Sequence, residues 1–392
     1  MPRSATVRSL PALLRPDPRR DPVVETLRGL ACVLLVLFHV RGDGPDAGLR
    51  LDASNPWSYA VDSLTYLRMP LFTFLSGVVH ARRPLSGPLG AFARGKARRL
   101  LVPVLVVGTA FALSRRLGGD TSDGPWYLWH LHPVAHFWFL ESVFWVFLLV
   151  AVLERLHLLD RLGGALAAVV LAGLAEVLVP SPGNVLGWRT AVYLLPFFLA
   201  GLAAQRFGWR SAPRPAHVLA VVLALALTAT TQLGLLGVVE RVPPRGDPLA
   251  VALGVLACLS LLLVPWRVGP LVVLGGFSFT VYTTHVFATA GTRTVLERLG
   301  VGSVTVHVVL GTLAGLAFGV LVELLARRDA WSAALLLGRR WPPLHRASRT
   351  GGAEVVVLPP DTPAHTTAST PASTTARSGA RGGAARPARP AP

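Results

Sequence analysis

Apolar runs of the length that crosses a bilayer recur from residue 23 to residue 325, and they restrict the possible fold more than any other feature of the chain. Only helices and closed barrels satisfy their backbone polar groups in lipid, and a spanning helix needs roughly 20 apolar residues. Hydrophobic residues make up 52% of the chain and charged residues 15%, whereas soluble domains carry about 25% charged residues. The sequence therefore predicts an all-α integral membrane protein.

About ten transmembrane helices are expected, at 23–41, 58–80, 99–116, 134–153, 162–179, 189–206, 216–238, 248–265, 268–290 and 303–325. They predict a cytoplasmic N-terminal segment (1–22), a membrane domain (23–326) and a cytoplasmic tail (327–392). After about residue 350 the tail holds mainly Ala, Thr, Pro, Ser and Arg, so it cannot bury a core and is expected to be disordered.

Basic residues indicate the orientation, because cytoplasmic loops of membrane proteins are enriched in Lys and Arg. The densest basic segment is the loop 82–99, which holds Arg82, Arg83, Arg94, Lys96, Arg98 and Arg99. Placing this loop inside puts both termini in the cytoplasm, which agrees with an even number of helices.

The net charge of +18 raises the possibility of nucleic-acid binding. The arginines lie between apolar runs and in the two tails, however, so no nucleic-acid partner is expected. Cys32 and Cys258 both fall inside apolar runs and are expected to be small buried residues, not a disulfide. The basic N-terminus has features of a signal peptide, but Arg28 and His39 bracket the first apolar run, so an uncleaved helix is predicted.

Arg28 and His39 are the first candidates for chemistry, since ionisable groups inside membrane spans are costly and usually functional. They are eleven residues apart, which places both side chains on one helical face, about 16 Å apart along the axis. Histidine suits proton transfer because its pKa lies near neutrality. The alternative is a helix-end arginine that reaches the lipid phosphates and a packed histidine.

Six short motifs follow one another in a fixed order within residues 23–290. They are Arg28 with His39 after ten intervening residues, Met69-Pro70-Leu71-Phe72 with Ser76-Gly77, Lys96-Ala97-Arg98-Arg99-Leu100-Leu101-Val102-Pro103, Phe137-Trp138-Phe139-Leu140, Leu195-Pro196-Phe197-Phe198-Leu199-Ala200-Gly201, and Ser278 with Tyr282 and His285. This series resembles the acyltransferase-3 family of membrane-bound O-acyltransferases, and most closely its sugar O-acetylating branch.

The resemblance implies transfer of an acyl group, usually acetyl from acetyl-CoA, to a hydroxyl of an extracytoplasmic or lipid-linked carbohydrate of the cell envelope. It further implies a multi-pass enzyme of the bacterial plasma membrane that uses no metal. His39 and Arg28 are the expected catalytic residues, with His39 acting as a general base or becoming transiently acylated. Some family members carry a fused esterase-like domain, and none is found in these 392 residues. The chain is therefore expected to act alone or with a separate acyl-accepting protein.

Arg98 and Arg99 match the family motif and are predicted to hold the phosphates of acetyl-CoA, because guanidinium groups form bidentate hydrogen bonds with phosphate. Arg28 is a further candidate for this contact. The alternative is that the basic loop only anchors the chain at the inner membrane surface.

Ser278, Tyr282 and His285 share one helical face within about 40°. They could form a substrate-binding wall opposite His39, or they could join helices through hydrogen bonds. The other predicted substrate-binding residues are Trp138, Glu141 and Arg68. Glu141 either sets acceptor specificity or pairs with Arg68, and the pair is favoured because an unpaired buried charge costs several kcal/mol.

Aromatic residues and histidines gather before the fourth span, namely Trp126, Tyr127, Trp129, His130, His132 and His136. The aromatics are typical of an interfacial belt, with a sugar-stacking platform as the alternative. The histidine spacing on a loop, with no cysteine, does not favour zinc. Asp62, Glu176 and Glu323 are interpreted as solvated or helix-end residues.

Two other classes of function fit ten helices with a polar interior. A transporter or flippase for a glycolipid or small molecule would move its substrate without releasing CoA. A non-catalytic membrane scaffold leaves Arg28 and His39 unexplained. Within the enzyme class, succinyl or a longer acyl group is the alternative to acetyl.

Overall fold

The computed structural model describes residues 19–42, 48–83, 85, 87–179, 183–239 and 242–342. The chain divides into two compact units, Met1–Pro343 and Leu344–Pro392, and the described residues all belong to the first. Most of the predicted N-terminal segment and the tail predicted to be disordered lie outside them. Within the described ranges there is no β-strand, only one isolated bridge between Trp129 and His132.

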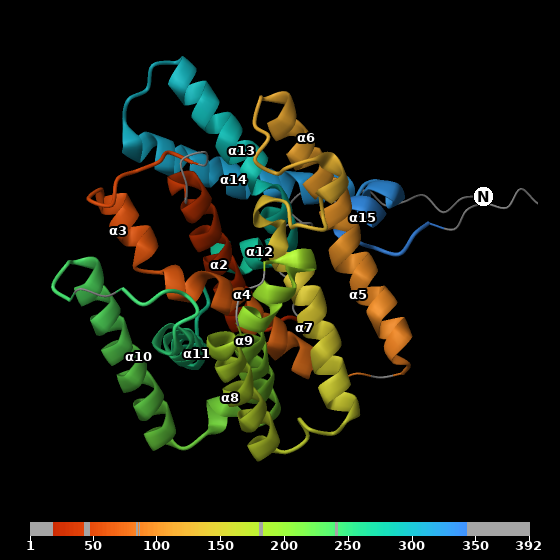
Figure 1. Ribbon diagram of the computed structural model, residues 1–392, viewed down its shortest axis with the longest axis vertical. Coiled ribbons are helices and arrows are strands. Elements are labelled where there is room, and N and C mark those ends of the chain that lie inside the picture. The colour runs from red at the N-terminus through yellow and green to blue at the C-terminus, as the bar shows by residue number, and fades with distance from the viewer. Residues whose placement is uncertain are drawn as a thin grey trace, which may run out of the picture. The chain divides into compact units, whose positions relative to one another are not determined.

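Figure 1 shows how the helices of the described residues follow one another along the chain. They are α2 (Pro22–Arg41), α3 (Pro56–Asp62), α4 (Thr65–Ala81), α5 (Leu89–Pro103), α6 (Thr109–Leu117), α7 (Trp138–Arg155), α8 (Leu162–Leu178), α9 (Trp188–Arg206), α10 (Arg214–Leu235), α11 (Pro248–Leu263), α12 (Gly269–Gly276), α13 (Ser278–Arg298), α14 (Val304–Ala326) and α15 (Ala330–Leu337). A π-helical turn, η1 (Val104–Gly108), joins α5 to α6, and a 3₁₀ turn, η3 (Ala135–Phe137), leads into α7.

Helix occupies each of the ten predicted spans. Among the described residues, six helices are long and apolar enough to cross a membrane, or seven if the bent pair α12–α13 counts as one span. The helices α8 and α11 are apolar but shorter. A multi-pass membrane protein is therefore supported, whereas the count of ten and the cytoplasmic placement of the termini are not confirmed.

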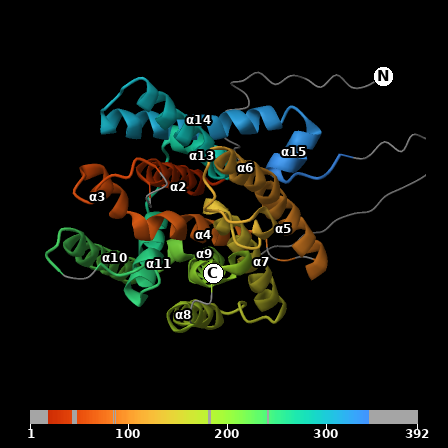
Figure 2. The ribbon, with the colours of Figure 1, turned by 45° about the horizontal axis from the view of Figure 1, so that its top comes forward.

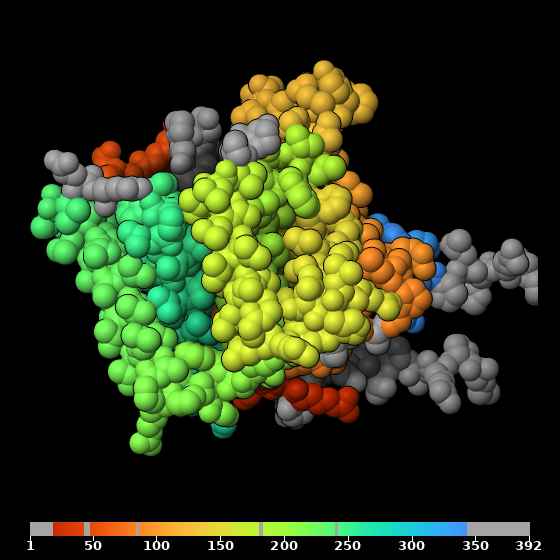
Figure 3. All heavy atoms as spheres, turned by 60° about the horizontal axis from the view of Figure 1, so that its bottom comes forward, coloured from red at the N-terminus to blue at the C-terminus, as the bar shows by residue number. Residues whose placement is uncertain are grey.

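One face of the bundle carries the side chains expected of a lipid-facing surface. Figure 3 shows this face, with α10 and α11 in green beside the yellow-green and yellow of α8 and α7. Large apolar side chains are exposed along α8 and α10, including Leu166, Val170, Leu171, Val218, Leu219, Val222 and Leu225. Apolar surface of this extent would be unfavourable in water and is stable against hydrocarbon.

The predicted span 268–290 is not one straight helix. The helices α12 and α13 meet at Phe277 with a bend of 88°. The short α12 packs along the first half of α2, and α13 then packs against both α2 and α14. Figure 2 shows α13 and α14 side by side, with α2 close to them. The bend therefore surrounds α2 with two consecutive helices instead of one.

Two glycines allow α12 to lie directly on α2. A Cβ atom at Gly29 would collide with the backbone of Leu271, and a Cβ atom at Gly275 would collide with the backbone of Glu25. Each helix thus contributes one glycine to a contact in which backbone meets backbone, as in small-residue packing between membrane helices. The contact fixes the N-terminal half of α2 and leaves its C-terminal half to other neighbours.

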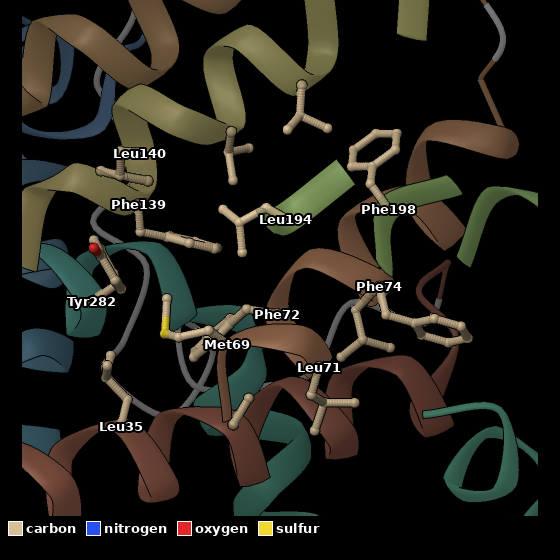
Figure 4. Packing of buried hydrophobic residues seen from close by; sticks show 14 of the residues in the cluster. Leu35, Met69, Leu71, Phe72, Phe74, Phe139, Leu140, Leu194, Phe198 and Tyr282 are labelled. Atoms are coloured by element: carbon tan, nitrogen blue, oxygen red, sulfur yellow. The ribbon is translucent and has the colours of Figure 1, made fainter. Parts of the chain in front are cut away.

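The same reciprocal arrangement joins α4 to α9. A Cβ atom at Gly77 would meet the carbonyl of Phe198, and one at Gly201 would meet the carbonyl of Phe74. Figure 4 shows Phe74 and Phe198 in the surrounding apolar core, where both rings are fully buried. Two of the six motifs, those ending in Gly77 and Gly201, therefore serve packing between these two helices.

Candidate active site

A cavity of about 890 Å³ lies beside the C-terminal end of α2. Its wall is formed by α2, α4, α6, η3, α7, α13 and α14, together with the segments around Leu49 and Arg245. It reaches the surface where the lining residues Ser114 and Thr294 are exposed. This volume lies within the roughly 300–1,000 Å³ typical of small-molecule sites.

Three histidines from three separate elements meet at this cavity. His39 comes from α2, His136 from η3 and His285 from α13. Their ring centroids are 4.8 Å apart for His39 and His285, 5.1 Å for His136 and His285, and 5.5 Å for His39 and His136. His39 and His136 line the cavity directly, and His285 is fully buried behind His39.

Glycines of α14 bring His285 close enough to His39. A Cβ atom at Gly315 would lie 2.8 Å from a methyl of Val36 on α2 and 2.9 Å from a methyl of Thr289 on α13. One helical turn further, Gly319 packs against the backbone of α13 at Val281. Because α14 presents no side chain at these points, α2, α13 and α14 can pack closely together.

Hydrogen-bond partners assign the protons of this pair. Nδ1 of His285 lies 2.8 Å from the carbonyl oxygen of Val281 and 2.9 Å from that of Tyr282, so it carries the proton that these acceptors require. In the neutral ring, Nε2 then holds a lone pair, and it lies 3.1 Å from Nδ1 of His39. Nδ1 of His39, which is also 2.9 Å from the carbonyl oxygen of Leu35, is therefore the donor. The lone pair of His39 is left on Nε2.

The ring of the third histidine has no hydrogen-bond partner among the described residues. Both ring nitrogens of His136 are buried and form no hydrogen bond with them. Its backbone is held in place, because the hydroxyl of Tyr282 donates to the carbonyl oxygen of His136. A neutral imidazole offers one donor and one acceptor, so His136 presents unused hydrogen-bonding capacity next to His39.

Sequence reasoning did not select His136 as a site residue. It grouped His136 with His130 and His132, whereas the ring of His136 lies with His39 and His285. His130 instead contacts the hydroxyl of Thr109 at 2.9 Å. Within the part of the chain that the structure describes, no group of three or more His, Cys, Asp or Glu residues is placed to hold a metal ion.

Arg28 faces a different environment from His39. It does not line the cavity, and its Nη1 lies 3.2 Å from Oε1 of Glu25. The other oxygen of Glu25 lies 3.3 Å from Nη1 of Arg20. Arg99 is an electrostatic neighbour of both arginines. Arg20 and Arg28 bind the buried Glu25, and together with Arg99 they form an arginine cluster at the N-terminal half of α2.

The predicted pair Arg98 and Arg99 is divided between two environments. Arg99 belongs to the arginine cluster, whereas Nε of Arg98 donates to the carbonyl oxygen of Gly338 at 3.4 Å. Gly338 ends α15 in a left-handed conformation and packs against the backbone of Arg98 and Arg99. Arg98 therefore ties α5 to the residue that ends α15.

The predicted substrate-binding residues are only partly brought together. Arg68, Trp138 and Tyr282 line the cavity. Ser278 begins α13 and is not part of the wall, and Glu141 is not part of it either. The wall therefore contains about half of the residues that the sequence predicted for it.

The predicted pair of Arg68 with Glu141 is wrong. Among the described residues, neither carboxylate oxygen of Glu141 has a hydrogen-bond partner. The side chain of Glu141 packs against Gly187 before α9, whereas the guanidinium carbon of Arg68 lies 3.3 Å from the ring centroid of Phe38 on α2. The two side chains face different helices, which spacing along the sequence does not reveal.

Three other carboxylates inside predicted spans have arginine partners. Asp62 was expected to be solvated, but its Oδ2 lies 2.9 Å from Nη2 of Arg41. Glu176 binds Arg189. Glu323 binds Arg327 at 2.5 Å and accepts a hydrogen bond from Thr280 at 2.6 Å. These groups connect helices and do not line the cavity.

Comparison with known proteins places this geometry in a family. The model of the acyltransferase-3 family, described as an acyltransferase domain, matches residues 22–325. The chain therefore belongs to the acyltransferase-3 family, and it is a multi-pass membrane protein with an acyltransferase domain. No curated protein and no solved structure matches it.

Proposed function

We propose that the protein transfers an acyl group, in the first instance acetyl from acetyl-CoA, to a hydroxyl of an extracytoplasmic or lipid-linked carbohydrate at the bacterial plasma membrane. The observation that carries this proposal is the contact between Nδ1 of His39 and Nε2 of His285, which are 3.1 Å apart. It leaves the lone pair of His39 on Nε2, and His39 lines a cavity of about 890 Å³. A base of this kind suits attack by a hydroxyl on a thioester.

In the proposed reaction, Nε2 of His39 accepts the proton of the acceptor hydroxyl as its oxygen attacks the thioester carbonyl. The new C–O bond forms, the C–S bond breaks, and the CoA thiolate recovers the proton from His39. His136, whose ring nitrogens have no hydrogen-bond partner among the described residues, can donate an N–H to the oxygen on which negative charge develops. In the alternative route His39 itself is transiently acylated, and it uses the same nitrogen.

Donor and acceptor approach His39 from opposite ends of α2 in this proposal. The arginine cluster offers guanidinium groups to the phosphates of acetyl-CoA. Arg28 and His39 are about 16 Å apart along the helix axis, and the extended arm of the donor would bridge this separation. The aromatic rings of Trp138 and Tyr282 line the cavity on the acceptor side.

The proposal is tested by CoA release from acetyl-CoA with the protein in lipid nanodiscs and a panel of carbohydrate acceptors. His39→Ala should lower release by about 100-fold or more, since this is the contribution of a general base. The matched control is His157→Ala, because His157 is an exposed histidine far from the cavity wall. Succinyl-CoA and longer acyl donors in the same assay define the acyl group.

Activity near that of the wild type in His39→Ala would overturn the assignment of the base. Movement of a glycolipid across the bilayer without release of CoA would favour a transporter. Release that requires an added membrane fraction would point to a separate acyl-accepting protein.

A further inference from the structure

The cavity wall carries an excess of positive charge. Four arginines from different segments line it, namely Arg68, Arg115, Arg245 and Arg293. Among the described residues of the wall, Asp120 is the only carboxylate. A cleft lined by charges of one sign concentrates ligands of the opposite sign. A wall built only for a neutral sugar would not need this imbalance.

Arg115 and Arg293 bind residues of the cavity wall and of the neighbouring loop. Arg115 donates to Asp120 at 2.8 Å and to Asp123 at 3.1 Å. Hydrogen bonds from the backbone N–H of Ser122 and from Arg115 lower the pKa of Asp120 to about 2, so this pair stays ionised. Arg293 donates to the backbone carbonyl oxygen of Gly48. These two arginines shape the mouth of the cavity.

Arg68 and Arg245 line the cavity close to the ring of Phe38, the residue before His39. The guanidinium carbon of Arg68 is 3.3 Å from the ring centroid of Phe38, and that of Arg245 is 5.8 Å from the same centroid. Phe38 precedes His39, and their ring centroids are 5.2 Å apart. Arg245 forms no hydrogen bond or ion pair with the residues that the structure describes. Its donors are available to a ligand in the cavity.

We propose that the acceptor is anionic, and that Arg245 holds its carboxylate or phosphate group while a nearby hydroxyl reaches Nε2 of His39. Carboxylate and phosphate each present two oxygens that a guanidinium can bind with two hydrogen bonds. A uronic acid and a phosphate-linked sugar are the two sources of that group. This inference rests on the proposed function and narrows its substrate class. The donor phosphates have a separate set of arginines at the other end of α2.

Binding is measured on His39→Ala protein in nanodiscs, so that turnover does not interfere. The probes are methyl glucuronoside, glucose 1-phosphate and the neutral control methyl glucoside, and the readout is the dissociation constant from calorimetry. At least one anionic probe should bind about tenfold more tightly than the neutral one, and added salt should weaken its binding. Comparison of methyl glucuronoside with glucose 1-phosphate distinguishes recognition of a sugar carboxylate from recognition of a phosphate.

The variant Arg245→Gln, combined with His39→Ala, should reduce the preference for the anionic probe about tenfold. The matched control is Arg298→Gln, because Arg298 is an exposed arginine at the end of α13 that does not line the cavity. Arg245 lies between helices α10 and α11, so the substitution leaves the packing of the bundle intact.

Three results would overturn this inference. Equal binding of the neutral and anionic probes is the first, and no binding of either anionic probe is the second. The third is an Arg245→Gln variant, with His39 intact, in which the KM for acetyl-CoA rises while the anionic preference persists. CoA release is measured separately, so failure of the acyltransferase reaction itself appears as absent release with every acceptor.

Discussion

The two ends of α2 differ in how they use charge. At the N-terminal end, Asp21 binds Arg82 at 2.7 Å and Arg210 at 3.0 Å, and Glu25 binds Arg20 and Arg28. At the C-terminal end, by contrast, Nδ1 of His39 is held by protein partners and its Nε2 carries the lone pair. His39 there borders a cavity of about 890 Å³.

In the proposed reaction, this difference would let one helix serve two substrates. In this proposal, the end that carries the arginine cluster and packs against α12 would hold the donor in one position. An imidazole with one nitrogen held by protein partners and the other left open gives a reactive end. Four predictions separate these two roles.

The largest effect is expected at the reactive end. His285→Ala removes the acceptor that orients His39, and transfer should fall about 100-fold, which corresponds to roughly 2.7 kcal/mol. The same change in His39→Ala protein should have little further effect, because His285 acts through His39. His285→Gln, whose amide oxygen can still accept a hydrogen bond, should recover part of the activity. Fully additive losses in CoA release would mean that the two histidines act independently.

The next effect tests the rigid end. Gly29→Ala forces the backbone of α12 away from α2 and should destabilise the protein by about 1–3 kcal/mol, which is seen as a lower melting temperature in detergent. Gly95→Ala is the control, because Gly95 is also helical and a Cβ atom there would meet no other atom within 4 Å. Equal melting temperatures for the two variants would show that α12 can move without cost.

A smaller effect separates donor from acceptor. Arg28→Gln removes one guanidinium from the arginine cluster and should raise the KM for acetyl-CoA about tenfold, as expected for a lost charge-assisted contact. Binding of the anionic carbohydrate probe should stay unchanged, since Arg28 does not line the cavity. If the variant instead loses binding of the carbohydrate probe and keeps its KM for acetyl-CoA, the assignment of donor and acceptor to the two ends of α2 is reversed.

The smallest effect concerns pH. Burial alone would raise the pKa of Asp21, but the hydrogen bond from Arg82 and the charge of Arg210 outweigh it, and the net pKa is lowered. A lowered pKa in the folded state adds stability above the unfolded value of 3.8, and this stability is lost as the pH falls below it. Asp21→Asn keeps the helix cap and loses the charge, so it should cost about 1 kcal/mol or less at neutral pH.

The difference in melting temperature between wild type and Asp21→Asn should therefore shrink as the pH falls below about 4. A difference that is constant with pH would assign the effect of Asp21 to the helix cap alone.

The sequence predicts local features of this fold well. The first span was expected at 23–41, and α2 is Pro22–Arg41. Asp21 accepts hydrogen bonds from the first backbone N–H groups, and Pro22 begins the helix, both of which are common start signals. The spacing argument placed Arg28 and His39 on one face of α2, but only His39 lines the cavity.

Features that depend on contacts between helices were not predictable in the same way. The bend at Phe277 arises where α12 meets α2, and the hydropathy pattern does not reveal it because both helices are apolar enough to count as one span. His136 joins His39 only because η3 turns its ring toward α13. Arg68 faces Phe38 instead of Glu141 because contacts between helices, which the sequence does not show, decide its neighbours. A single sequence carries no signal for such pairings, whereas covarying positions in homologues would.

The two cysteines have a practical consequence for the direction in which α2 crosses the membrane. Cys32 and Cys258, the only cysteines of the chain, are both free and fully buried. A thiol reagent that does not cross membranes should find no target in the folded native protein. A single cysteine placed at exposed Arg116 or Arg161 would then be labelled only from the compartment that it faces. The natural sequence therefore needs no removal of cysteines before such labelling is used in intact cells to find which side of the membrane each loop faces.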